Sequence, residues 1–167
     1  SGVAVVLKLA EALAKQKKER PTELARGVVV GLWSGEELGL VGSNFFVENP
    51  PMPANMLMAV MNFDMVGRLR ENHLILQGVG SSSSWRSMIE KRNVAAGFNL
   101  TLQDDPYLPT DSMSFYLKKI PTLNFFTGSH EDYHRPSDDA DKLDFEGMGR
   151  IAKFAEGIAV DLLKVPA

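Results

Sequence analysis

The sequence predicts an α/β fold, a three-layer sandwich with a mainly parallel sheet and helices on both faces. Short apolar runs rich in valine, leucine and phenylalanine alternate along the chain with segments whose apolar residues recur at helical spacing. This interleaving favours strand–helix–strand units, in which helices cover a parallel sheet. The length of 167 residues is that of one ordinary domain.

Helix signals recur along the whole chain. The clearest is an apolar face of isoleucine, phenylalanine, alanine and leucine near the C-terminus. Serines before one segment provide an N-cap and Gly97 after it a C-cap, and Thr110 or Asp111 caps another. The expected helices cover residues 3–15, 40–47, 85–96, 110–118 and 145–164.

Strand signals lie between these helices. Each is a short run of apolar residues of a length that suits a buried strand. The first run, Gly-Val-Val-Val-Gly-Leu-Trp, is the richest in β-branched residues. The expected strands cover residues 27–33, 56–63, 74–77, 100–103 and 122–126.

Composition excludes several classes of function. The net charge of -3 and the pI near 5.6 give no basic surface of the kind that binds nucleic acid. No apolar run approaches the roughly 20 residues that span a bilayer, so we expect neither a nucleic-acid nor a membrane partner. The chain has no cysteine and 3 histidines, so a metal would have to be held by carboxylates and imidazoles.

Carboxylate and imidazole side chains follow three of the predicted strands. They are Glu36 and Glu37 after the first run, Asp64 after the second, and those of the loop 127–138 after the last, which contains His130, His134 and several carboxylates. Sites in open α/β sheets gather beyond the carboxyl ends of the strands, and zinc accepts these residue types as ligands. Each residue alone also fits a solvated turn or a charged surface loop. Their coincidence at three strand ends is what favours a metal site.

Four blocks of sequence resemble the signature segments of M28 family zinc metallopeptidases, in the same order. They are the Glu-Glu segment 34–43, the strand-end aspartate segment 62–67, the segment 110–122 before the last strand, and the histidine segment 130–138. The match covers essentially the whole chain. It implies a zinc exopeptidase-like fold, in which residues 1–167 form a single catalytic domain without its N-terminal part.

The resemblance implies a two-zinc aminopeptidase that acts on peptide substrates. Glu36 would be the general base that takes a proton from the attacking water and passes it to the leaving amine. Glu37 and His134 would bind one zinc, and Asp64 would bind the second.

Three further residues receive supporting roles from the same resemblance. Tyr133 would be catalytic, through a hydrogen bond to the tetrahedral intermediate. Asp111 and Asp138 would orient the metal ligands from behind and tune their basicity. His130 is expected to be an ordinary loop residue.

The family uses five ligands for two zinc ions, and two of them have no counterpart in this sequence. The resemblance places these two in a segment before Ser1. Because a catalytic zinc usually has three protein ligands, we expect weak zinc binding and poor activity or none. We also expect an exposed sheet edge that promotes self-association.

Two other functions stay open at this point. A non-catalytic peptidase-like domain would share the fold, although the joint presence of a base and three ligands argues against it. A glutaminyl cyclase-like enzyme would use a single zinc to close the ring of an N-terminal glutamine. The resemblance to bacterial members favours an extracellular or periplasmic location.

Overall fold

One sheet of four strands organises the computed structural model, which describes residues 1–165 apart from the side chain of Ala54. The strands, in spatial order, are β1 (Val60–Phe63), β4 (Thr122–Phe126), β2 (His73–Gln77) and β3 (Asn99–Gln103). β1 is parallel to β4 and β2 is parallel to β3, while β2 and β4 are antiparallel. The expected mainly parallel sheet is confirmed.

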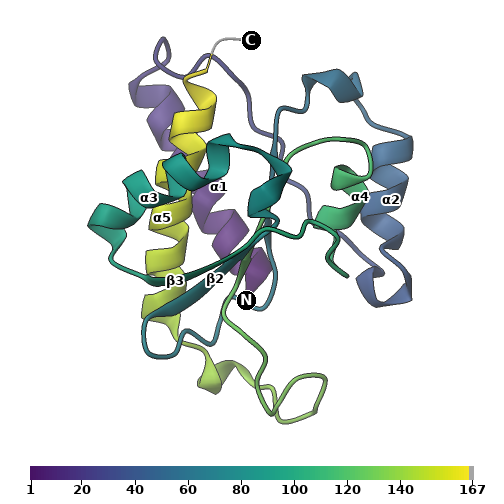
Figure 1. Ribbon diagram of the computed structural model, residues 1–167, viewed down its shortest axis with the longest axis vertical. Helices are drawn as coiled ribbons and strands as arrows, with labels where there is room; N and C mark the ends of the chain where they lie inside the picture. Colours follow the sequence, from purple (N-terminus) through teal and green to yellow (C-terminus); the bar gives the residue numbers. More distant parts are fainter. Residues whose placement is uncertain (166–167) are drawn as a thin grey trace.

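All five predicted helices are present (Figure 1). They are α1 (Gly2–Glu19), α2 (Val41–Glu48), α3 (Ser84–Ala96), α4 (Ser112–Tyr116) and α5 (Phe145–Leu163). α1 continues through the charged residues to Glu19, because lysine, glutamine and glutamate are good helix formers, and it ends two residues before Pro21. Among residues 1–165, no helix has the length and apolarity needed to cross a membrane.

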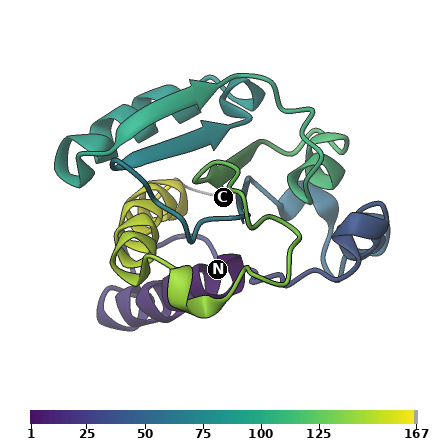
Figure 2. The same cartoon turned by 90° about the horizontal axis from the view of Figure 1, so that it is seen from below.

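Each face of the sheet has its own hydrophobic cluster, because strand side chains alternate between the faces. Leu74 of β2 and Leu123 of β4 are fully buried in the larger cluster, together with side chains of α1, α3 and α5. Val60 of β1 packs on the other face, where α2 and α4 contribute Val47 and Phe115. Figure 1 shows α2 and α4 side by side, apart from the other helices, and Figure 2 shows α1 beside α5. Helices therefore cover both faces, as predicted.

A row of four amide side chains crosses the face of the sheet that carries Val60. Asn62 donates to Asn124 at 2.9 Å, Asn124 donates to Gln77 at 2.7 Å, and Gln77 donates to Gln103 at 2.8 Å. The row takes one residue from each strand in spatial order and satisfies the amide of Asn124, which is 1% exposed. A slip of one residue in any strand would break it, so the row helps to fix the register.

The predicted strand over residues 27–33 is wrong. This segment is extended but pairs with no strand among residues 1–165. Val28 and Val29 are each 51% exposed, and Leu32 is 52% exposed. β-branched residues fit a pleated surface, but a strand forms only where a neighbouring strand accepts its backbone hydrogen bonds.

The predicted strand over residues 56–63 is confirmed only in its second half, which is β1. A single 3₁₀ turn, Ala54–Met56, lies before it, after a segment that contains Pro51 and Pro53. Because proline fixes φ and restricts the residue before it, this segment starts the strand late.

Candidate functional site

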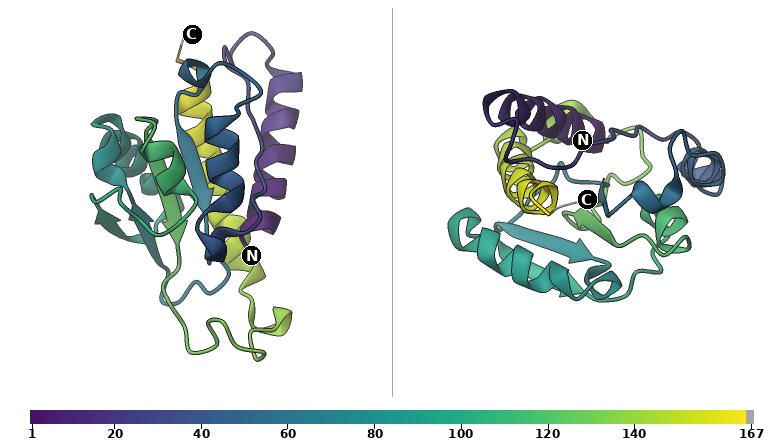
Figure 3. Two further views of the ribbon diagram at one scale, coloured as in Figure 1. Left: turned by 90° about the vertical axis from the view of Figure 1, so that its right-hand side faces the viewer. Right: turned by 90° about the horizontal axis from the view of Figure 1, so that it is seen from above.

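The ends of β1 and β4 define the edge of the sheet at which the candidate residues meet. Asp64 directly follows β1, and its backbone N–H donates to the carbonyl of Phe125 at 3.2 Å. Just beyond, the N–H of Thr127 donates to the carbonyl of Met65 at 3.2 Å. The chain then enters residues 128–139, the histidine loop, which projects from the rest of the molecule (Figure 3). Parallel pairing thus brings Asp64 and the histidine loop to one edge.

The glutamate pair lies on a tight turn that glycines make possible. The turn Glu36–Leu38 is flanked by Gly35 at φ 70° and Gly39 at φ 101°, both left-handed conformations that favour glycine. Gly42, at the start of α2, lies so close to the extended segment that a Cβ would meet backbone atoms of Ser34 at 2.8 Å. These glycines hold the two glutamates between the segment 27–35 and α2.

The histidine loop contacts the glutamate turn directly. The Nε2 atom of His134 lies 2.6 Å from Oε1 of Glu37, and the ring of Tyr133 stacks on the His134 ring at 3.9 Å between centroids. His134 has φ 55°, a left-handed conformation that is uncommon outside glycine. Such conformations persist where the surroundings impose them and often occur at functional sites.

Carboxylates accumulate at this edge, and the basic side chain that pairs with one of them is His134, beside Glu37. Burial raises the pKa of Glu36, and the charges of Glu37, Asp64 and Asp111 raise it further. Burial and the charge of Asp111 likewise raise the pKa of Asp64. Within residues 1–165, no lysine or arginine forms an ion pair with any of these four side chains. Carboxylates gathered in this way suit a site that receives a cation.

The donor atoms fit zinc only in part. Glu37 and His134 are adjacent and are ligand types that zinc accepts, as is the nearby Asp64. The buried Oδ1 atom of Asp111, a neighbour of Asp64, has no hydrogen-bond partner and is therefore available as an acceptor. However, no group of three such side chains within residues 1–165 is arranged to hold a metal ion by itself. The described residues thus offer donor types that zinc accepts, but no complete ligand set.

Asp138 contacts an arginine that follows β1. Its Oδ1 atom lies 2.5 Å from Nη2 of Arg68, and the same guanidinium lies 3.3 Å from Asp132. Asp132 is buried and also accepts hydrogen bonds from Lys142 at 2.5 Å and Ser137 at 2.7 Å. Lys142 above all, with Ser137 and Arg68, lowers the pKa of Asp132 to about 2. These five residues form the loop clamp, which anchors the histidine loop beside β1.

Sequence reasoning missed the loop clamp and a second polar group behind Asp111. There, Ser43 hydrogen-bonds Asp111 and lies 2.9 Å from the hydroxyl of Ser114, which donates to Asn44 at 2.7 Å. Ser43 is 0% exposed and Ser114 2%. Serines at buried positions of predicted helices were the available signal, because a buried hydroxyl requires a partner.

The family model described as peptidase family M28 matches residues 1–159. Leucine aminopeptidase 2 of Arthroderma otae is 27% identical over 138 residues, which are 77% of this chain and 27% of that protein. The chain therefore spans about a quarter of the length of this curated relative.

Solved structures share the fold. LapB from Legionella pneumophila matches with a TM-score of 0.73 and 18% identity, over 92% of this chain and 44% of that one. BSAP, a zinc aminopeptidase from Bacillus subtilis, matches with a TM-score of 0.64 and 24% identity, over 78% of this chain and 34% of that one. At these identities the likeness establishes the α/β architecture.

Proposed function

Because the chain belongs to peptidase family M28, we propose that its site releases N-terminal amino acids from peptides, with zinc as the cofactor. The observation that carries the proposal is the cluster of carboxylate side chains at the ends of β1 and β4. The contact between His134 and Glu37 connects this cluster to the histidine loop. A leucine aminopeptidase among the relatives supports the reaction, and a zinc aminopeptidase of the same fold supports the metal.

Glu36 is the proposed general base. Its raised pKa, caused by burial and by three neighbouring carboxylates, brings it closer to the pH at which it can accept and return a proton. Zinc, when bound, polarises the scissile carbonyl and acidifies the attacking water. Glu36 then takes the proton of that water and delivers it to the leaving amine.

Tyr133 is proposed to donate a hydrogen bond to the tetrahedral intermediate. Burial and the nearby charges of Glu37, Asp64 and Glu36 raise the pKa of Tyr133, so its hydroxyl stays protonated and can donate. Stacking on His134 positions the ring. Because the tyrosine is 46% exposed, its hydroxyl is accessible to a substrate.

Glu37 and His134 are the proposed ligands of one zinc, and Asp64 of the second. Three protein ligands for two ions is a sparse set, since catalytic zinc usually has three of its own. We therefore propose that this chain binds zinc weakly and turns over slowly. Asp111 is proposed to orient the ligands without binding the metal itself. Asp138 is proposed to do so indirectly, through its contact with Arg68 and the position of the histidine loop.

The exposed segment 27–33 supports a proposal about assembly. Its backbone pairs with no strand within the described part of the chain, and Val28, Val29 and Leu32 are each about half exposed. Extended backbone with apolar side chains recruits strands from other chains. We propose self-association through this segment. Separately, we propose an extracellular or periplasmic location, which rests only on the resemblance to bacterial members of the family.

Three peptides separate the proposed reaction from its alternatives. The zinc-loaded chain is incubated with a leucine-initiated tripeptide, a glutamine-initiated tripeptide, and the leucine peptide with a blocked N-terminus, and products are identified by mass spectrometry. We expect free leucine from the first peptide only, no leucine with Glu36→Ala, and unchanged release with Glu90→Ala, which replaces an exposed glutamate of α3.

Each other outcome decides against the proposal. Ring closure of the glutamine peptide would favour the cyclase. Cleavage of the blocked peptide would indicate an endopeptidase. Turnover retained by Glu36→Ala would show that Glu36 is not the general base. No product from any peptide in the presence of zinc would favour the non-catalytic domain.

A further inference from the structure

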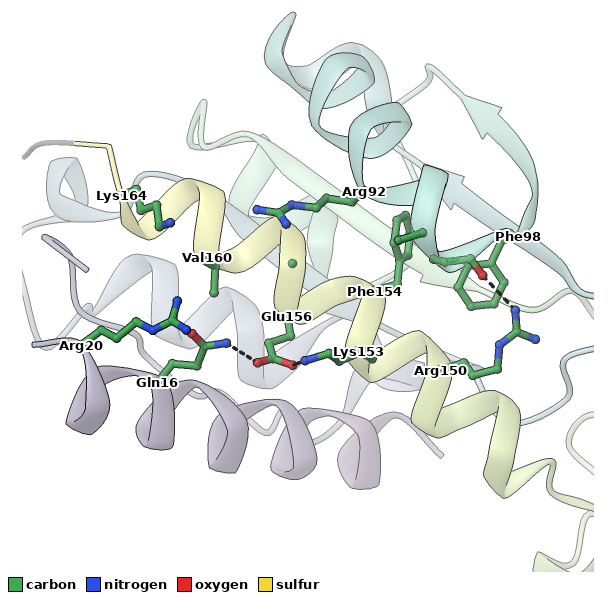
Figure 4. Close-up of a pocket in the computed structure, with 13 residues that line it drawn as sticks. Gln16, Arg20, Arg92, Phe98, Arg150, Lys153, Phe154, Glu156, Val160 and Lys164 are labelled. Carbon is green, nitrogen blue, oxygen red and sulfur yellow. Dashed lines mark hydrogen bonds and ion pairs between the residues drawn. The ribbon is translucent and has the colours of Figure 1, made fainter. Parts of the chain in front are cut away.

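A groove with a cationic rim lies on the helical side of the molecule, formed by α1, α3 and α5 (Figure 4). Its volume is about 460 Å³. None of its lining residues belongs to the candidate active site. A function of this groove would therefore be separate from the peptidase chemistry.

The charge of the groove is opposite to that of the chain. The chain has a net charge of -3, yet the lining contains five cationic side chains and one carboxylate, that of Glu156. Glu156 is buried, and its two oxygens accept hydrogen bonds from Gln16 at 2.6 Å and Lys153 at 2.8 Å. Its charge is thus compensated within the wall, and the groove stays attractive to anions.

Three of the cations have donor capacity to spare. Arg92 is engaged through two nitrogens with Asp161, whereas Arg150 donates one hydrogen bond, to the carbonyl of Ala96, and lies over the ring of Phe98. Arg20 and Lys164 both face Glu23, at 3.8 and 3.9 Å. These two separations exceed hydrogen-bond length, so both cations can bind a new acceptor.

The available cations stand at the two ends of the groove. Figure 4 shows Arg20 and Lys164 at one end and Arg150 at the other, with Phe154 and Val160 between them. Arg150 and Lys164 are separated by fourteen positions along α5 and its C-cap, which corresponds to about 21 Å at the rise of an α-helix. A single small anion cannot reach both ends, whereas an extended peptide spans this length with about six or seven residues.

We propose that this groove binds an acidic peptide segment of about six or seven residues, with carboxylates at both ends and an apolar side chain in the middle. The terminal carboxylates pair with Arg150 at one end and with Arg20 and Lys164 at the other. The apolar side chain lies against Val160, beside the buried rings of Phe98 and Phe154 that contribute to the floor of the groove.

Fluorescence anisotropy with a labelled peptide, Glu-Asp-Glu-Phe-Glu-Asp-Glu, tests the proposal. We expect saturable binding that weakens as salt is raised, because exposed ion pairs are screened. The double substitution Arg150→Gln with Lys164→Gln should weaken binding roughly three- to tenfold. The matched control, Lys18→Gln with Lys119→Gln, removes the same charge outside the groove and should leave binding unchanged.

Several results would overturn the proposal. Equal loss in the control pair would show non-specific charge attraction. Equal binding of a peptide with serine in place of phenylalanine would show that the proposed apolar contact does not contribute to binding. A single-stranded oligonucleotide that bound more tightly than the peptide, through Arg150 and Lys164, would identify a nucleic-acid surface instead. A thermal melt of each variant checks that it is folded, and Lys164→Gln alone provides a milder change.

Discussion

At the scale of single residues, the candidate site contains partly buried carboxyl groups whose ionised form is unfavourable in the folded protein. Asp111 is partly buried, its pKa is raised by burial, and one of its oxygens has no partner. A carboxyl group whose pKa is higher in the folded than in the unfolded protein weakens folding at neutral pH. Such a cost is typical of sites built to bind a ligand rather than to stabilise the protein.

We predict that Asp111→Asn stabilises the metal-free protein by about 0.5 to 2 kcal/mol. The amide removes the charge that burial penalises and keeps nearly the same shape. Denaturant unfolding at pH 7 with a chelator measures the change, and Asp141→Asn, on the exposed 3₁₀ turn Ala140–Lys142, serves as the neutral control. A loss of stability in Asp111→Asn would show that the bond from Ser43 outweighs the cost of burial.

The sequence predicted which carboxylates would gather at the sheet edge, but not most of the polar contacts around them. Glu36, Glu37 and Asp64 follow apolar runs, so pattern and resemblance both single them out. Arg68 and Ser43 act through contacts with residues distant in the chain, namely Asp138 at 2.5 Å and Ser114 at 2.9 Å. Such contacts depend on how elements pack, which local patterns do not specify.

At the scale of elements, the histidine loop depends on its clamp. The five residues of the clamp fix a segment that has few apolar contacts of its own, as its exposed side chains indicate. Because this loop carries Tyr133 and His134, its attachment controls the geometry of the proposed site.

We predict that Asp132 makes stability depend on pH below 4. Its pKa is about 2 in the folded protein against an ordinary value of 3.8. The ionised carboxylate therefore stabilises the fold fully above the ordinary value, and this contribution is lost as pH falls towards 2.

Melting temperatures at about pH 4 and about pH 2 measure this effect. The fall between the two should be smaller in Asp132→Asn than in the wild type, while Asp141→Asn should behave as the wild type. An equal fall in all three proteins would contradict the assigned role of the clamp.

The prediction of secondary structure failed where pairing decides the outcome. α2, α3, α5 and β4 were predicted to within one residue at each end, because amphipathic spacing and caps are local signals, whereas α1 continues four residues further than predicted. The run 27–33 has the strongest β signal, but no neighbouring strand in residues 1–165 accepts its hydrogen bonds. Strand formation is a property of a pair, so composition alone could not settle it.

At the scale of the whole molecule, the surface divides into three regions with different chemistry. Carboxylates gather at the edge near Asp64, cations line the groove between α1, α3 and α5, and apolar side chains are exposed along residues 28–32. The exposed apolar segment is the feature most relevant to assembly.

We predict that the chain self-associates as its concentration rises and that Val29→Lys reduces this association. A charged residue on an unpaired extended segment discourages strand addition. Light scattering after size-exclusion chromatography measures the mass, and Val94→Lys, at an 87% exposed position of α3, is the control. A monomer at every concentration would contradict the proposal.

The central claim, that Glu37, Asp64 and His134 are the metal ligands of this chain, is tested most directly by calorimetric titration with zinc. The account predicts binding far weaker than nanomolar, reduced further by Glu37→Gln, Asp64→Asn or His134→Gln. It predicts little change with His73→Gln, whose exposed ring is hydrogen-bonded to Thr101 at 2.8 Å between β2 and β3, away from the proposed site. Two zinc ions retained at nanomolar free zinc would contradict the claim. So would a zinc affinity that is unchanged by all three substitutions.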